Sequence, residues 1–269
     1  MNGAREPFDP AKLISSLQSA GATAEQSGHI AAHIEAELVD GITTNDIYRH
    51  AFDLLRTTSR PLAVRYSMKR AISDLGPNGF PFERFVAEIF KAKGYEAVTG
   101  QIVYGGCVEH EMDVVAWKDD ELVMVEAKFH NEPGLKSDLK VALYVKARFD
   151  DLKDQQFEYG GRKRALTSWF LVTNTKFTDH AIRYAKCKGL GLIGWNYPTK
   201  GSLEELIAEA GLHPLTCLTT LSQVEKHALL GAGLVLCKHV KEKIGMLAEL
   251  GIDPKKAPAI LEEISAVCS

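Results

Sequence analysis

Residues 112–128 read MDVVAWKDDELVMVEAK, two apolar segments separated by a run of charged residues. Short apolar runs that flank a polar turn are typical of a β-hairpin. We therefore predict strands over Met112–Trp117 and Leu122–Phe129, joined by a loop formed by Lys118–Glu121. This hairpin decides the expected fold, because it fixes which side chains share one face of the sheet.

A four-residue loop sets the register of the two strands. Trp117 then lies opposite Leu122, and counting back along both strands places Asp113 opposite Glu126. Opposed residues on antiparallel strands share a face, with Cβ atoms roughly 4.5–5.5 Å apart. Lys128 joins this pair because residues two apart on a strand point the same way.

Two facing carboxylates in an apolar hairpin repel one another, and burying them without a partner is costly. A divalent cation held by Asp113 and Glu126 would remove that cost, and Mg²⁺ suits such oxygen ligands, with Mn²⁺ as a substitute. The ion would activate a water and stabilise charge on a phosphate, while Lys128 orients the water or offsets the developing charge. The alternative is an ordinary hairpin in which Lys128 neutralises surface acids.

The composition sets the broad class of protein. The chain has 269 residues, 45% of them hydrophobic, with a formal net charge of −3 and a pI of about 6.3. This content supports several domains, without a membrane span or a signal peptide, and we expect a cytoplasmic protein. A globally basic surface is absent, so any contact with nucleic acid must come from local patches. The five scattered cysteines form no C-x-x-C pair, which argues against a zinc site or a disulfide framework.

Around the hairpin, the patterns predict an α/β domain over residues 80–198. Its elements in order are a helix over Phe82–Lys93, a strand over Tyr95–Tyr104, the hairpin, a helix over Lys136–Lys153, a strand over Trp169–Thr173, a helix over Thr178–Lys188 and a strand over Leu190–Trp195. Hairpins followed by a crossover imply a mixed sheet with helices on both faces.

Helical modules are expected on both sides of this domain. Residues 1–74 carry four amphipathic patterns, and residues 203–269 carry four more, over Glu204–Ala210, Gln223–Leu230, Leu234–Leu250 and Pro258–Val267. The predicted protein is therefore a multidomain α/β protein with three parts.

The middle domain resembles the Mrr-like branch of the restriction-endonuclease fold, whose nucleases carry the PD-(D/E)xK motif. The resemblance covers about Phe80–Trp195 and rests on Phe82–Val86, Gly94–Tyr95, Asp113–Ala116 and Glu126–Lys128. It implies metal-dependent hydrolysis of DNA phosphodiester bonds by Asp113, Glu126 and Lys128, with Glu83 approaching the metal and Glu88 a weaker candidate for that role. A solvated helix charge is the alternative for Glu83. Cutting both strands would require two active sites, which is compatible with a homodimer.

Further polar residues suggest contacts with DNA. His130 and Asn131 either line the cleft or form a turn before the next helix. A dense group of basic residues, some on an expected mobile loop after Gly160–Gly161, either holds the DNA backbone or forms solvated surface. Its members are Lys136, Lys140, Lys146, Arg148, Arg162, Lys163 and Arg164.

The first module resembles an ATP-cone, the small helical regulatory domain of ribonucleotide reductases. The resemblance rests on Asn2–Gly3, Phe8, Lys12–Leu13, Ile42–Ile47 and Arg65–Tyr66. It implies that a nucleotide such as ATP controls the neighbouring domain, through contacts of Glu6, Asp9, Lys12, Thr44 and Tyr48. The basic pair of that family lies on a strand before the Asn2–Gly3 turn, and this chain starts at Met1, so we expect weak nucleotide binding at best.

Two weaker patterns remain. The turn Leu230–Leu234 resembles the hairpin of helix-hairpin-helix domains, whose backbone amides hold a DNA phosphate, although a plain helical turn explains it as well. His29 and His33 have zinc-ligand spacing on a helix, but the glutamate of H-E-x-x-H is absent, so we interpret them as helix surface.

Three functions compete at this stage. The favoured one is a Mg²⁺-dependent DNA endonuclease, gated by nucleotide and serving in defence against foreign DNA. The second is a nuclease-like DNA-binding regulator with lost or marginal catalysis, and the third is an interaction protein whose helical modules recruit partners. The intact Asp113, Glu126 and Lys128 favour the first function.

Overall fold

The computed structural model of the chain describes residues 7–132 and 134–267. The contacts divide the protein into two compact units, Met1–Arg70 and Ala71–Ser269. Among the described residues, no helix is both long and apolar enough to cross a membrane.

The first unit is helical, as predicted. Its helices are α1 (Pro10–Ser19), α2 (Ala24–Ala36), α3 (Thr44–Thr58) and the first part of α4 (Arg60–Ser73). Thr23 and Thr43 each form a capping box that fixes the start of α2 and α3. Leu17, Ile34 and Leu55 are fully buried in the core between the helices.

A five-stranded mixed sheet forms the centre of the second unit, and its strand order is β1-β2-β3-β7-β9. The first three strands are antiparallel neighbours, whereas β3, β7 and β9 are parallel. The strands are β1 (Glu96–Tyr104), β2 (Glu109–Lys118), β3 (Glu121–Lys128), β7 (Ser168–Thr173) and β9 (Gly191–Ile193). The predicted mixed sheet is therefore confirmed.

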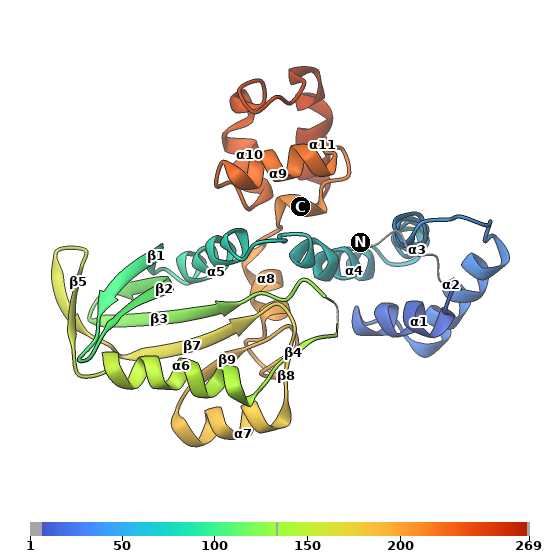
Figure 1. The fold of residues 1–269 in the computed structure, drawn as a ribbon. Helices are drawn as coiled ribbons and strands as arrows, with labels where there is room; N and C mark the ends of the chain where they lie inside the picture. Colours follow the sequence, from blue (N-terminus) through green and yellow to red (C-terminus); the bar gives the residue numbers. More distant parts are fainter. Residues whose placement is uncertain (1–6, 133, 268–269) are drawn as a thin grey trace. The chain divides into compact units, whose positions relative to one another are not determined.

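Helices cover both faces of this sheet, as Figure 1 shows. Helix α5 (Phe80–Ala92) packs on β1, β2 and β3, while α6 (Leu139–Leu152) and α7 (Asp179–Lys188) lie together on the opposite face. The apolar core under α6 contains Met124 from β3 and Phe149 from the helix itself. This packing fixes the hairpin between two rigid layers.

The hairpin has the predicted register, because Trp117 pairs with Leu122. The predicted loop length was wrong. Lys118 also pairs with Glu121, so the turn contains only Asp119 and Asp120, and Asp119 adopts a positive φ of 49°. A two-residue turn with this conformation matches the twist of the strands, and the aspartate side chain tolerates it.

The expected mobile loop around Gly160–Gly161 is instead a second hairpin, formed by β5 (Gln156–Tyr159) and β6 (Arg162–Ala165). Both glycines have positive φ, which a tight turn requires. A side chain at Gly160 would also place its Cβ 2.7 Å from Nε1 of Trp117. The glycine pair is a turn signal that the sequence interpretation missed.

The helix predicted from Lys136 begins later. Asp138 caps α6 by accepting hydrogen bonds from the amides of Lys140 and Val141. Residues Lys136–Ser137 form the short strand β4, which pairs with β8 (Lys176–Phe177).

The last part of the chain belongs to the second unit by its contacts. Its helices are α8 (Leu203–Ala210), α9 (Gln223–Gly231), α10 (Cys237–Glu242) and α11 (Ala257–Val267), with single 3₁₀ turns at Leu215–Cys217, Ile244–Met246 and Pro254–Lys256. Thr216 donates a hydrogen bond to the carbonyl oxygen of Ala71, and α8 contacts α5.

One helix prediction in this part was wrong. Residues 234–236 precede α10 in an extended conformation, with Leu236 bridged to Pro214 and the carbonyl of Val235 accepting from Leu215. The run Leu234–Cys237 is fully apolar and buried, so its sequence suits an extended segment as well as a helix.

Candidate active site

Asp113 lies where the β2–β3 ladder ends. The last paired residues are Val114 and Val125, and one step further the Oδ2 atom of Asp113 accepts a 2.6 Å hydrogen bond from the amide of Ala127. The side chain thus replaces the main-chain acceptor that a longer ladder would supply. This bond fixes the Asp113 carboxylate beside Glu126, so the structure brings the two predicted acids together.

Glu126 is partly buried and forms an ion pair with Arg148 of α6. The same guanidinium donates to the carbonyl oxygen of Glu111 on β2. Burial and the nearby Asp113 raise the pKa of Glu126 to about 7, against the lowering effect of Arg148 and Lys128. The positive charge on Arg148 therefore compensates the acid cluster only in part.

Glu83, in the first turn of α5, completes the cluster from the other layer. Burial, together with the charges of Asp113, Glu111 and Glu126, raises the pKa of Glu83 to about 7. Burial also raises the pKa of Asp113, although the amide of Ala127 and Arg148 act in the opposite direction. Several acids with raised pKa values in one place are typical of a functional site.

Lys128 is exposed at the end of β3, where its charge lowers the pKa of both Asp113 and Glu126. It is therefore placed to meet a group bound at the carboxylates. The sequence interpretation missed Glu111 as a member of the site. It named Arg148 only as a basic residue and did not predict its ion pair with Glu126. Glu111 lies two residues before Asp113 on β2 and shares its face, but the predicted strand began only at Met112. The contact of Arg148 depends on how α6 packs.

His130 and Asn131 hold the segment after β3. The side chain of Asn174 accepts a 2.8 Å bond from the His130 amide and donates a 2.9 Å bond to its carbonyl. Nε2 of His130 lies 3.0 Å from Oγ of the buried Ser137, and Asn131 donates to the carbonyl of Pro77. These contacts support the turn interpretation of both residues.

Glu88 does not join the acid cluster. Its carboxylate binds Lys91 on α5 and His239 and Lys238 on α10, at 2.8, 3.3 and 3.4 Å. Burial alone would raise the pKa of Glu88, but the hydrogen bonds from His239 and Lys91 lower it to about 2. The structure therefore assigns this residue to the packing of α10 on α5.

The predicted basic group is not one surface. Arg164 is buried and donates to the carbonyl oxygens of Asp119 and Tyr159, so it supports the two hairpin turns. Lys146 forms an ion pair with Asp150. The exposed members are Lys136, Lys140, Arg162 and Lys163.

The predicted nucleotide ligands lie on two helices of the first unit, except Glu6, which is outside the described residues. Asp9 caps α1 and Lys12 lies in that helix, whereas Thr44 and Tyr48 belong to α3. The ring of Tyr48 stacks on Tyr66 with a centroid distance of 5.0 Å. This ring therefore contributes to packing of the helices.

The backbone amides of the turn after α9 are hydrogen-bonded within the turn and the end of the helix. Those of Ala232, Gly233 and Leu234 donate to carbonyl oxygens of Ala228, Leu230 and Leu229. Arg84 of α5 also donates to the carbonyl of Leu230. These contacts support a plain helical turn over a phosphate-binding hairpin.

The mixed sheet, with an acid–acid–lysine cluster at one end of its central hairpin, defines a nuclease-like α/β domain. A family model described as "Restriction endonuclease" matches residues 77–196, and one described as "AF1548-like, C-terminal" matches residues 213–268. The resemblance inferred from the sequence is therefore supported for the middle domain.

A similar protein sequence and a solved structure agree with this assignment. An uncharacterized protein of Archaeoglobus fulgidus is 40% identical over 186 residues, which cover 68% of this chain and 99% of that protein. The crystal structure of AF1548, a protein of unknown function, is 38% identical with a TM-score of 0.59 and covers 71% of this chain and 98% of that one. The chain therefore belongs to the AF1548-like family of restriction-endonuclease-like proteins.

Proposed function

We propose that this protein is a Mg²⁺-dependent DNA endonuclease that hydrolyses phosphodiester bonds at Asp113, Glu126 and Lys128. The observation that carries the proposal is the convergence of Glu83, Asp113 and Glu126, from α5, β2 and β3, at one end of the sheet. Burial and mutual repulsion raise the pKa of Glu83 and Glu126 to about 7, so the fold maintains an unfavourable concentration of acidic side chains.

The donor set fits a hard divalent cation. Carboxylate oxygens are the ligands that Mg²⁺ takes in proteins, and the pKa of Glu126 is raised even with Arg148 and Lys128 nearby. Asp113 and Glu126 would hold the ion, and Glu83 would approach it from α5. When bound, Mg²⁺ supplies Lewis acidity toward the phosphate and a water.

The protein groups have distinct roles in this proposal. Asp113 is oriented by the amide of Ala127, which prevents its carboxylate from turning away from β3. Lys128, exposed beside both acids, holds the scissile phosphate and offsets the charge that develops on it. Arg148 neutralises Glu126 in the metal-free protein and then becomes available to a DNA phosphate.

The test is cleavage of supercoiled plasmid with Mg²⁺, with Mn²⁺ or with EDTA. Asp113→Asn should abolish nicking and linearisation, because it removes a ligand charge while keeping the size of the side chain. Asp120→Asn is the matched control, since this exposed aspartate lies in the turn of the same hairpin. The control should cut like the parent protein.

Two results would contradict the proposal. One is an absence of cutting on modified and unmodified plasmid with either metal, accompanied by DNA binding, which would favour the nuclease-like regulator. The other is equal cutting by Asp113→Asn and the parent, which would indicate a contaminating nuclease. Sizing of the protein on its DNA would test whether a homodimer supplies two active sites.

Control by a nucleotide and a role in defence belong to the same proposal. The first rests on the ATP-cone resemblance, with Asp9, Lys12, Thr44 and Tyr48 on helices of the first unit. Addition of ATP to the plasmid assay tests it, and Lys12→Ala should abolish any response. Equal cutting with and without ATP would remove the regulatory role and leave the nuclease proposal intact.

A further inference from the structure

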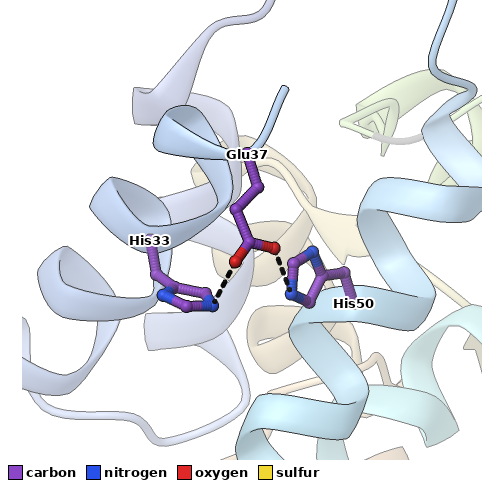
Figure 2. Close-up of side chains that lie close together, drawn as sticks. All are labelled: His33, Glu37 and His50. Atoms are coloured by element: carbon purple, nitrogen blue, oxygen red, sulfur yellow. Dashed lines mark ion pairs between the residues drawn. The ribbon is translucent and has the colours of Figure 1, made fainter. Parts of the chain in front are cut away.

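His33, Glu37 and His50 form a cluster in the first unit, shown in Figure 2. Nε2 of His33 lies 3.3 Å from Oε1 of Glu37, and Nε2 of His50 lies 3.3 Å from Oε2 of the same carboxylate. The three potential ligand atoms all lie within 4.8 Å of one another. Both histidines therefore present the same ring nitrogen to one carboxylate.

The packing of α2 on α3 creates this arrangement. His33 lies in the last turn of α2, and Glu37 follows four residues later at the C-cap, so the two share a helix face. Buried Ile34 and Ala51 belong to the core between the helices, which brings His50 of α3 to the same place. The two imidazole rings meet edge to face, with centroids 5.4 Å apart.

The three side chains are close enough to share one metal ion and leave one position open. Ligands about 2.0–2.2 Å from a tetrahedral Zn²⁺ are roughly 3.3–3.6 Å from each other. Each histidine Nε2 lies 3.3 Å from a different oxygen of Glu37, and all three ligand atoms lie within 4.8 Å of one another, so small side-chain rotations bring them to these distances. The side chains of His33, Glu37 and His50 are 42%, 54% and 31% exposed, so an ion can enter from solvent. We propose that His33, Glu37 and His50 bind a divalent transition-metal ion of the Zn²⁺ class, with water as the remaining ligand.

The ligand chemistry separates this site from the one on the sheet. Imidazole nitrogen suits Zn²⁺, Ni²⁺ or Cu²⁺, whereas Mg²⁺ prefers oxygen ligands only. The ion would join the end of α2 to α3 and so strengthen the helical unit. The proposal does not depend on nuclease activity, and it explains why a histidine predicted as helix surface faces a carboxylate and a second histidine.

The test uses the full chain, stripped with EDTA and titrated with Zn²⁺ by calorimetry in excess Mg²⁺ and a thiol-free buffer. We expect the parent protein to bind one equivalent of Zn²⁺ that is lost in His33→Ala and in His50→Ala. His29→Ala is the matched control, because this exposed histidine lies one turn earlier on α2, outside the cluster. Its titration should equal that of the parent, and any zinc held by exposed Cys107 or Cys187 is common to all variants.

Glu37→Gln provides a second test that keeps the size and hydrogen-bonding capacity of the side chain. Its affinity for Zn²⁺ should fall at least about tenfold, while circular dichroism shows an unchanged fold. Co²⁺ should report nitrogen and oxygen ligands in its visible spectrum, and that signal should disappear in His50→Ala. Equal zinc stoichiometry and affinity in the parent and both histidine variants would overturn the proposal and leave the cluster as an ion-paired contact.

Discussion

The guanidinium of Arg148 on α6 pairs with the carboxylate of Glu126 on β3 and at the same time donates to the carbonyl of Glu111 on β2. One side chain thus connects the helix layer to both strands that carry the acid cluster. Because the side chains of Arg148 and Glu126 are 11% and 19% exposed, solvent screens this pair only weakly. Arg148 is therefore a structural counter-charge of Glu126.

Replacing Arg148 by Ala should destabilise the protein in EDTA. The change leaves Glu126 partly buried without its ion-pair partner, which typically costs about 1–3 kcal/mol. Urea unfolding measures the loss, and Mg²⁺ should restore part of it by supplying positive charge. Lys153→Ala is the control, since its pair with Asp150 is 3.9 Å long and exposed, and its effect should stay within about 0.5 kcal/mol. Equal effects of the two variants would contradict this role for Arg148.

The free energy of unfolding in EDTA should fall as the pH rises from about 5 to 8. The pKa values of Glu126 and Glu83 are raised to about 7, so the folded protein binds protons that the unfolded chain releases near pH 4.5. The stabilisation is complete below that pH and is lost as the pH passes 7, by on the order of 1–3 kcal/mol. Denaturant titrations across this range measure it. Glu126→Gln should flatten this pH profile. Glu109→Gln is the control, because Glu109 is exposed on β2, and it should leave the profile unchanged. A flat profile for the parent would refute the raised pKa values of Glu83 and Glu126.

Arg164→Lys should destabilise the protein although it retains the charge. Arg164 donates to the carbonyl of Asp119 at 2.8 Å and to that of Tyr159, and a lysine cannot reproduce this fork. We expect a loss of about 1–3 kcal/mol in thermal unfolding, because two part-buried hydrogen bonds lose their donor. Lys163→Ala, at an exposed position on the same strand, should leave stability nearly unchanged and instead weaken DNA binding. An unchanged thermal stability of Arg164→Lys would show that the hairpin does not need these hydrogen bonds.

Glu88→Gln should loosen the packing of α10 on α5. The carboxylate accepts bonds from Lys91 and His239, so at pH 7 its neutralisation should cost about 1–3 kcal/mol. The pKa of Glu88 is lowered to about 2, so its contribution is present above pH 4.5 and disappears as the pH falls toward 2. The parent and the variant should therefore converge in acid. Glu262→Gln, an exposed change on α11, is the control, and a constant difference at all pH values would argue against an electrostatic cause.

The sequence by itself determined the hairpin and its register. Two apolar runs separated by a polar turn place Trp117 opposite Leu122, and the structure has this pairing even though the turn is shorter than predicted. Such patterns act locally, because the pleat of a strand fixes which side chains share a face. The order of helices and strands around residues 112–128 followed from the same periodicities.

Only the tertiary structure decided which groups meet across layers. Glu83 lies near Asp113 and Glu126, whereas Glu88 pairs with His239 of α10. Arg148 pairs with Glu126, although all three residues are charged and lie on helices. Their spacing in the sequence carries no information on which element packs against each helix. The same is true of His50, which reaches Glu37 only because α3 packs on α2. Contacts between distant segments depend on the packed core, whereas strand register depends on neighbouring residues.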